Sequence, residues 1–459
     1  MATASQQMAR NAGLGSFGKA KDLQKRILFT LFILVIYRIG TFLPVPGIDP
    51  NQYAAFFEGQ QSGMLGNLNI LSGGAIERMG IFALNVMPYI TASIIIQMMT
   101  SASPALEKLK KEGESGRKQI NQYTRYLTLL FALVQSFGIS VGLASVRIET
   151  INYPFFMLTS VVSLTGGTMF LMWLGEQVTA RGVGNGISLI IFAGIVAELP
   201  TAMFQALRSA QETSGNITFI FLFLIMMTAL ILFIVFIERA QRRLLIQYPK
   251  RQAANQGAAQ GQSSFLPMKL NVSGVIPPIF AIAIVGLPLT LLNITSGGAA
   301  AGAEAAAGEA VASGGFLQTL VSYVGQNTPG YIILYGVLIA FFTFFYTSIV
   351  FNPEETADNL RKYGGFIPGI RPGKNTAEYL DYVLTRLTVI GTAYLVFVCV
   401  LPEFLRLQYS SQIPTFFNGM SLLIVVSVTI DTVTQIQSHL VAHQYENLIK
   451  KSKLGGRKK

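Results

Sequence analysis

The sequence predicts an all-α integral membrane protein with ten transmembrane helices, arranged as two inverted halves of five helices each. Three observations lead to this prediction: an apolar composition, ten apolar segments of membrane-spanning length, and a one-sided distribution of positive charge. Of the 459 residues, 51% are hydrophobic and only 12% are charged, whereas soluble domains carry about 25% charged residues. The composition therefore favours a chain embedded in a lipid bilayer.

Ten apolar segments account for the predicted helices. A helix needs about 20 mostly apolar residues to cross the hydrocarbon core of a bilayer. Segments of about this length lie at 27–45, 80–99, 126–146, 155–174, 187–205, 217–237, 275–294, 330–351, 384–402 and 416–436. The first is long and is not followed by a small-residue cleavage site, so we expect it to be retained rather than removed as a signal peptide.

The distribution of positive charge supports this count and orients the chain. Lysines and arginines concentrate in the N-terminus, the C-terminal tail and the long connecting segments on the same side, whereas each segment on the opposite side holds at most one. By the positive-inside rule, both termini are expected in the cytoplasm, which requires an even number of spans. We therefore expect a multi-pass protein of the cytoplasmic (inner) membrane.

The ten spans divide into two sets of five, and an odd number in each set gives the two halves opposite orientations. The expected organisation has these parts: a cytoplasmic N-terminus at 1–26, a first half at 27–205, a second half at 206–436 with cytoplasmic loops at 238–274 and 352–382, and a basic cytoplasmic tail at 437–459. Two Ala/Gly-rich segments, 251–264 and 296–315, have compositions that cannot form a core alone.

The second span of each half is expected to be interrupted. Asn85 and Pro88 fall in the first case, and Pro277, Pro278 and Pro288 fall in the second. Interrupted helices at matching positions of two repeats point to a functional centre in membrane proteins.

Motifs for catalysis are not found in the sequence, so we expect neither an enzyme nor a cofactor. The stretch GLGSFGKA at 13–20 resembles a phosphate-binding loop, but no strand precedes it, and Ala20 stands where a metal-holding Ser or Thr is needed. His439 and His443 lie one helical turn apart, and two ligands alone make a poor metal site.

A secondary solute transporter remains the alternative prediction, because it would share the inverted repeat and the interrupted helices. Such a protein needs polar or charged ligands near the middle of the membrane. Within the spans the sequence singles out only Arg38 and Asp431, which gives little support to a solute or ion pathway.

Several long stretches, spread over the whole chain, carry a resemblance to a known family. They are SGGAIERMGIFALNVMPYITASIIIQ, KKEGESGRKQINQYTRY, GTMFLMWLGEQVTARGVGNGISLIIFAGI, VIPPIF, FNPEETADNLRKYGGFIPGIRPG and SLLIVV. In these stretches the chain resembles the SecY family, the channel-forming subunits of the bacterial protein translocase. The resemblance implies a central pore between the two halves and a lateral gate between spans 2 and 3 on one side and 7 and 8 on the other.

The resemblance also implies a function and a set of partners. Unfolded secretory chains would cross the membrane through the pore, and segments of membrane proteins would leave sideways into the lipid bilayer. The partners implied are the SecE and SecG membrane subunits, the SecA ATPase, the ribosome, and signal peptides and nascent chains.

A ring of apolar side chains is expected to seal the pore, since such a ring excludes water when the pore is empty. The resemblance places it at Val86, Ile90, Ile187, Ile191, Ile279 and Ile424. Pattern alone would assign these residues to packing. Asn85, directly beside the ring, is a polar residue where a smaller one is expected.

A plug is expected next to the ring, at about 66–76. Its residues are Gly66, Leu68, Ile70, Leu71, Ser72, Gly73 and Gly74. The alternative is an ordinary re-entrant loop, but irregular backbone at membrane depth persists only where protein buries it or where it lines a cavity.

Two further sets of residues follow from the resemblance. Gln97 and Asn271 are predicted to hydrogen-bond across the lateral gate, with packing inside one half as the alternative. Exposed basic residues are predicted to contact SecA or the ribosome: Arg239, Arg242, Arg243, Lys250, Arg251, Arg371 and Lys374. Of these, Arg371 is expected to be the sharpest single contact.

Overall fold

The computed structural model describes residues 21–58, 69–148, 150–212, 217–248, 263–295, 328–408 and 418–455. In these ranges the chain is almost entirely helical, and each of the ten predicted spans coincides with a helix. Four of the predicted site residues lie outside the described residues: Gly66, Leu68, Lys250 and Arg251.

Within the described residues, the first half contains five long helices, three short helical elements and one helical turn at 69–72. The long helices are α2 (Lys21–Thr41), α5 (Met87–Ala102), α7 (Glu114–Gly142), α8 (Tyr153–Arg181) and α9 (Gly186–Glu212). The short elements are α3 (Pro50–Glu58), α6 (Pro104–Lys111) and the 3-10 helix η2 (Ala144–Val146).

The described residues of the second half also form five long helices. They are α10 (Ile217–Arg239), α11 (Ile276–Thr295), α13 (Pro329–Val350), α15 (Lys374–Gln408) and α16 (Gly419–Gly455). The short helix α14 (Pro353–Lys362) and the strands β1 (Gln241–Gln247) and β2 (Ser263–Lys269) belong to its loops.

Six stretches of the described residues are helical, long enough and apolar enough to cross a membrane. They are Glu114–Gly142, Tyr153–Arg181, Gly186–Phe204, Pro329–Lys362, Lys374–Leu407 and Gly419–Ala442, and Ile276–Val285 is a shorter apolar helix. The protein is therefore a multi-pass helical membrane protein by length and composition, and the full count of ten spans stays a prediction.

The second span starts later than the sequence predicts. Residues 81–86 form turns, and the helix α5 begins at Met87 with Pro88 in its first turn. Pro277 and Pro278 likewise fall in the first turn of α11. A first-turn proline lacks only an N–H that would be unpaired in any helix, so these three residues mark helix starts and not interruptions. The prediction of broken helices was wrong at these positions.

A two-stranded antiparallel hairpin corrects the all-α prediction. β1 pairs with β2 in the register Gln241↔Lys269 to Gln247↔Ser263, inside the predicted loop 238–274. Its apolar residues Leu244 and Met268 pack with Ala357 of α14 and Leu380 of α15. The sequence shows Gln247 and Phe366 in separate loops, but their backbones exchange hydrogen bonds of 2.9 and 3.0 Å, so the two basic loops form one unit.

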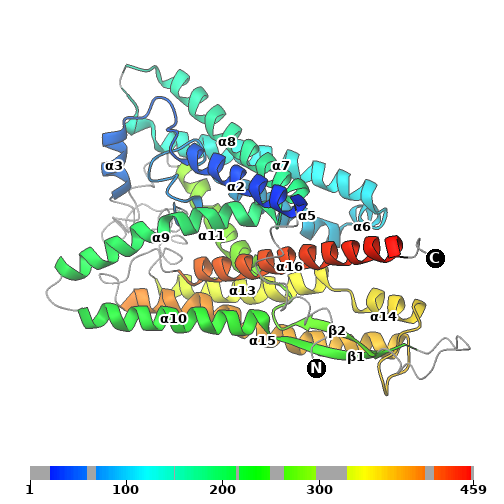
Figure 1. The fold of residues 1–459 in the computed structure, drawn as a ribbon. Helices are drawn as coiled ribbons and strands as arrows, with labels where there is room; N and C mark the ends of the chain where they lie inside the picture. The colour runs from blue at the N-terminus through cyan, green and yellow to red at the C-terminus, as the bar shows by residue number, and fades with distance from the viewer. Residues whose placement is uncertain are drawn as a thin grey trace, which may run out of the picture.

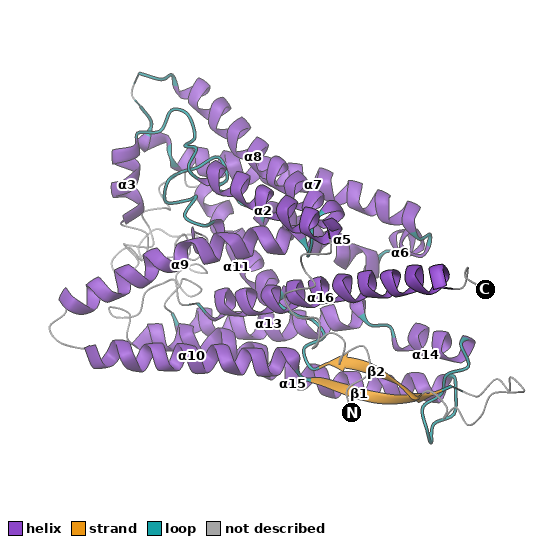
Figure 2. Ribbon diagram, in the orientation of Figure 1, coloured by secondary structure: helices purple, strands orange, loops and turns teal. Residues whose placement is uncertain are grey.

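The long helices run roughly side by side, and the short elements gather at the two ends of the molecule (Figure 1). The hairpin, α6, α14 and the C-terminal end of α16 lie at one end, and α3 lies at the other (Figure 2). The elements that the charge distribution assigns to the cytoplasm therefore share one end, which agrees with the predicted orientation.

Candidate functional site

The six predicted ring residues belong to one large apolar cluster that contains residues of both halves. Val86, Ile90, Ile191 and Ile424 are buried in it, and Ile187 and Ile279 are partly buried against it. The same cluster contains residues from α5, α9, α11 and α16, so it joins both halves. Apolar side chains, not charged ligands, therefore fill the centre of the described structure, which does not favour the solute-transporter alternative.

The described part of the predicted plug packs on this cluster. Residues 69–72 are helical, and Ile70, Leu71 and Ala75 are buried in the same apolar cluster as the predicted ring residues. Removing two large aliphatic side chains from water stabilises this position by about 1.5–3 kcal/mol each. The segment is thus seated in the protein interior, as irregular backbone at membrane depth must be.

Three side chains satisfy three consecutive carbonyls at the end of the plug helix. Asn85 Nδ2 donates to the Leu71 oxygen at 2.5 Å. Tyr37 donates to the Ser72 oxygen at 3.0 Å, and Arg38 donates to the Gly73 oxygen at 2.6 Å. The last carbonyls of a helix have no partner within the helix, so these bonds fix its C-terminal end.

Asn85 now has a physical explanation. Its backbone φ is +49°, a left-handed conformation that asparagine adopts more readily than most residues. Its side chain is buried and reaches the plug. The turn before α5 therefore needs a residue that tolerates this backbone and can also donate a hydrogen bond, and a smaller residue would lose the second property.

Gly73 lets the plug approach α9 closely. Its φ is +67°, and a Cβ atom at this position would lie 2.8 Å from the Gly194 Cα atom and 3.2 Å from the Tyr37 hydroxyl. Only glycine avoids both the backbone strain and the collision. The contact aligns the Gly73 carbonyl with Arg38.

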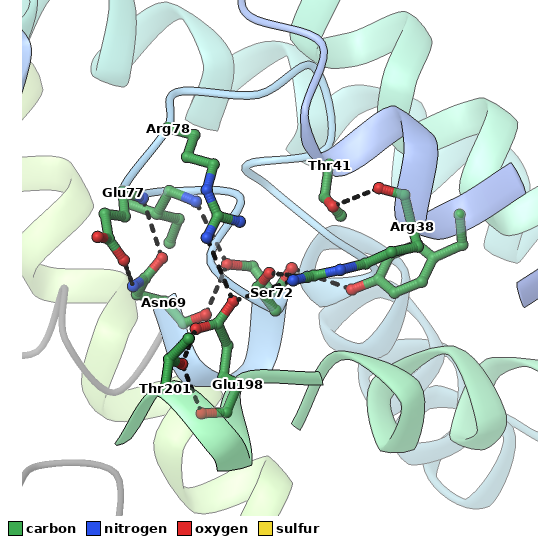
Figure 3. Close-up of polar contacts among 11 residues, drawn as sticks. Arg38, Thr41, Asn69, Ser72, Glu77, Arg78, Glu198 and Thr201 are labelled. Atoms are coloured by element: carbon green, nitrogen blue, oxygen red, sulfur yellow. Dashed lines mark hydrogen bonds and ion pairs between the residues drawn. The ribbon is translucent and has the colours of Figure 1, made fainter. Parts of the chain in front are cut away.

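An ionic cluster ties the segment after the plug helix to α2 and α9. The Glu198 carboxylate Oε1 lies 3.5 Å from an Arg38 guanidinium nitrogen and 3.7 Å from an Arg78 guanidinium nitrogen. Thr201 donates to the other carboxylate oxygen at 3.0 Å. Figure 3 shows Glu198 between the two arginines, next to Ser72 and the Asn69–Glu77 pair.

The rest of the plug segment is held by local bonds. Asn69 Oδ1 accepts the Glu77 N–H at 2.9 Å, and the Ser72 hydroxyl donates to the Asn69 oxygen at 2.9 Å. Tyr53 of α3 donates to the Ile76 oxygen at 2.5 Å. Burial raises the pKa of Tyr53, so its hydroxyl stays protonated and available as the donor.

Sequence reasoning missed Glu198. The residue lies within the span predicted at 187–205, yet it stands two positions before Pro200 and so reads as the end of an apolar run. The signal that could have found it is an acid inside a predicted span that also contains no base, since such an acid needs a partner from another helix.

The two predicted gate residues make their hydrogen bonds inside their own halves. Gln97 donates to the Ser93 hydroxyl on the same helix at 3.1 Å. Asn271 donates to Glu238 at 2.8 Å and accepts the Gly274 N–H at 3.1 Å. For Asn271 the alternative of packing within one half is the arrangement seen here, and helix α11 itself packs against α5 and α7 along the seam between the halves.

Replacing Asn271 by leucine should destabilise the protein. Glu238 is buried, and loss of its amide donor leaves a buried carboxylate without that bond, at a cost of about 1–3 kcal/mol. We expect a lower thermal midpoint in detergent for Asn271→Leu. Gln97→Leu is the matched control, since it loses one bond within a helix and should keep the midpoint of the unchanged protein. Equal midpoints for all three proteins would contradict this reading of Asn271.

The described basic residues of the two loops are exposed. Arg239, Arg242 and Arg243 lie at the end of α10 and on β1. Arg371 lies in the turn region that follows the Gln247–Phe366 contact, and Lys374 is the first residue of α15. The Thr376 hydroxyl donates to the Arg371 oxygen at 2.9 Å, so the exposed arginine stands on a fixed backbone.

Asp431, the other charged residue noted within the predicted spans, lies in a more exposed environment than Arg38 and Glu198. Asp431 forms an ion pair with Lys269 at 3.2 Å, with both side chains more than half exposed, and such a pair contributes little. No group of three possible metal ligands occurs among the residues that the structure describes.

The chain is similar in sequence to known proteins. A family model described as SecY matches residues 80–433. The chain is 50% identical over 440 residues to the protein translocase subunit SecY of Rickettsia bellii, covering 95% of this chain and 98% of that protein. It is 47% identical over 457 residues to the protein translocase subunit SecY of Escherichia coli K12, covering 98% and 99%.

Solved structures agree in fold. One described as a protein-conducting channel has a TM-score of 0.62 at 19% identity, covering 91% of this chain and 92% of that one. A second, of a SecY protein whose plug domain is described as stabilising the closed state, has a TM-score of 0.63 with the same identity and coverage. Because the family model matches most of the chain and about half of the sequence is shared with translocase subunits over nearly its full length, the chain belongs to the SecY family.

Proposed function

We propose that the protein is the central subunit of a protein-conducting channel in the cytoplasmic membrane. It passes unfolded secretory proteins across the membrane and releases membrane-protein segments sideways into the lipid. The observation that carries this proposal is the apolar cluster that contains residues of both helical halves. The plug segment packs in this cluster, and Tyr37, Arg38 and Asn85 hydrogen-bond to the carbonyls at the end of its helix.

The physical role of each part follows from its environment. The ring Val86, Ile90, Ile187, Ile191, Ile279 and Ile424 excludes water from the empty channel. The plug adds a second barrier, which must be displaced when a chain enters. The proposal also includes the organisation predicted from the sequence: ten spans in two inverted halves, both termini in the cytoplasm, and the predicted domain limits. A channel of this kind needs no catalytic group of its own.

The lateral gate is proposed at the seam where α11 meets α5 and α7. Gln97 stands on α5, one of the three helices of this seam, and bonds to Ser93 of the same helix. A hydrogen bond from Gln97 to a facing helix would contribute on the order of 1 kcal/mol, small enough to break when a hydrophobic segment enters. SecE and SecG are the proposed membrane partners of the two halves.

The cytoplasmic end is the proposed docking surface for SecA or the ribosome. The hairpin and the loop that carries Arg371 form one packed unit there. Similar folds are described as Sec61 and Ssh1 channels in complexes with ribosomes. Exposed guanidinium groups suit both RNA phosphates and acidic protein surfaces.

Cross-linking a stalled secretory chain tests the proposal. A photoreactive probe at Ile279, in the ring, should react with a signal-bearing chain arrested during translocation. The same probe at Ile225 of α10, whose side chain is 66% exposed on the outer surface of the described structure, should react with lipid and far less with the chain.

The outcome separates the two candidate functions. Strong cross-links at position 279 and weak ones at 225 support a protein-conducting pore. Equal or absent cross-links, together with tight binding of a small solute, would instead favour the transporter.

A further inference from the structure

We propose that Glu198 is a positioning residue that latches the plug to the first half through Arg38 and Arg78, and that this latch controls plug displacement separately from opening of the lateral seam. The inference rests on the proposed channel function and adds a regulatory contact to it. Three observations support it: where the polar partners of the plug lie, where its apolar partners lie, and which charges surround Glu198.

The polar partners of the plug all belong to the first half. Within the described residues, the segment 69–79 receives bonds or ion pairs from α2, α3, α9 and the turn before α5. The partners outside the segment are Tyr37, Arg38, Tyr53, Asn85 and Glu198. Val45 adds a backbone bond to the Met79 oxygen at 2.9 Å.

The apolar partners of the plug come from both halves. Ile70, Leu71 and Ala75 share their cluster with Ile191 of the first half and with Phe280 and Ile424 of the second. Separating the halves along the seam would therefore remove part of the apolar surroundings of the plug. It would break none of the polar contacts named above, because both ends of each lie in the first half.

Glu198 is the residue on which the charged part of this network depends. One of its carboxylate oxygens faces both guanidinium groups. The ring of Phe42 lies under the same two groups, 4.8 Å from Arg38 Cζ and 4.5 Å from Arg78 Cζ. The arginines are thus held between an aromatic face and a carboxylate, and without that carboxylate two positive charges would repel each other at close range.

The two arginines connect Glu198 to different parts of the plug. Arg38 donates to the Gly73 oxygen, at the end of the plug helix. Arg78 belongs to the returning segment itself. Loss of the Glu198 charge therefore loosens the plug at both places at once, while the apolar ring and the seam keep their contacts.

The test uses a buried cysteine on the plug as a reporter of displacement. Ala75 is fully buried, so Ala75→Cys in a Cys399→Ala background places a single thiol under the closed plug. A membrane-impermeant maleimide, added from the non-cytoplasmic side of sealed vesicles that contain the whole channel complex, labels this thiol only when the plug moves. Glu198→Gln keeps the shape and the Thr201 bond and removes the charge.

We expect the thiol to be labelled on the order of ten times faster in Glu198→Gln. Loss of a contact of this kind shifts the equilibrium between the closed and the displaced plug by about one order of magnitude. Export of a reporter with a weakened signal peptide should rise in parallel. The matched control is Glu107→Gln, which removes an exposed acid paired with Lys111 on α6, and it should label at the original rate.

Each outcome decides one question. Labelling and export unchanged by Glu198→Gln would overturn the latch while leaving the channel intact. An equal rise in Glu107→Gln would assign the effect to net charge and also overturn it. If the unchanged protein exports no signal-bearing reporter at all, the proposed function itself fails. A thermal midpoint equal to that of the parent shows that Glu198→Gln is folded, and Glu198→Asp should restore slow labelling in part.

Discussion

Deleting residues 69–76 should raise the ion conductance of the resting channel in a planar bilayer at least about tenfold. Burial of Ile70 and Leu71 contributes about 1.5–3 kcal/mol each to the seated plug. Stabilisation of that size keeps the plug displaced in fewer than about one in a hundred resting channels. Without the segment, the ring alone must exclude water and ions.

The deletion should leave the rest of the first half folded. Leu43 and Val45 bond to the backbone of Ile81 and Met79, at 2.8 and 2.9 Å, so the chain on the far side of the deletion stays joined to the end of α2. Signal-dependent translocation should therefore persist in the variant, with a higher leak.

A deletion of equal length at residues 253–260, in the Gln/Ala/Gly-rich segment that the sequence predicts to be cytoplasmic, is the matched control and should leave conductance unchanged. If the two deletions give the same resting conductance, segment 69–76 is not a plug and the re-entrant-loop alternative holds.

Much of the fold could be predicted from the sequence because the bilayer imposes a simple rule. Each helix must cover about 30 Å of hydrocarbon with apolar side chains, and each of the ten segments found by this rule overlaps a helix. The positive charge of the connecting segments also predicted which of them lie on the same side, and α6, α14 and the hairpin do lie at one end of the molecule.

The start of the second span could not be predicted, since the apolar run continues through residues that are not helical. Phe82, Ala83 and Leu84 are as apolar as the helix that follows, yet they form turns packed against α2 and α8. Hydropathy reports burial, and it does not distinguish a buried turn from a buried helix.

The latch could not be predicted for a different reason. Arg38, Arg78 and Glu198 are separated by 40 and 120 positions, and only the folded chain brings their charges within 4 Å. Asn85 stood out in the sequence as a misplaced polar residue, but its partner is a backbone carbonyl, which no sequence pattern identifies. The hairpin was missed because its strands lie inside a loop that was assigned by charge alone.

Replacing Arg371 by glutamate should nearly abolish SecA-driven translocation into membrane vesicles. The side chain is exposed at the end of the molecule that carries the hairpin and α14, in a turn fixed by the Thr376 bond and by the backbone pair between Gln247 and Phe366. An arginine presented on a fixed backbone loses little conformational freedom when a carboxylate partner binds it. Reversing its charge turns an attractive contact into a repulsive one.

The magnitude follows from the kind of contact. Losing one partner of a hydrogen-bonded charge pair that becomes buried at an interface costs about 2 kcal/mol or more, which corresponds to about a thirtyfold weaker binding of SecA. If SecA docks on this turn, as proposed, the translocation rate at limiting SecA should fall by a similar factor. Raising the SecA concentration should restore part of the rate.

Lys362→Glu provides the matched control. Lys362 ends α14, is exposed, and undergoes the same change of charge a few residues away, yet it lies outside the turn that carries Arg371. A specific docking contact predicts a large loss for Arg371→Glu and a small one for Lys362→Glu. If both variants lose activity equally, general attraction to a basic surface explains docking, because a uniform field depends on total charge and not on the position of one side chain. If Arg371→Glu translocates at the original rate, this turn is not where SecA binds.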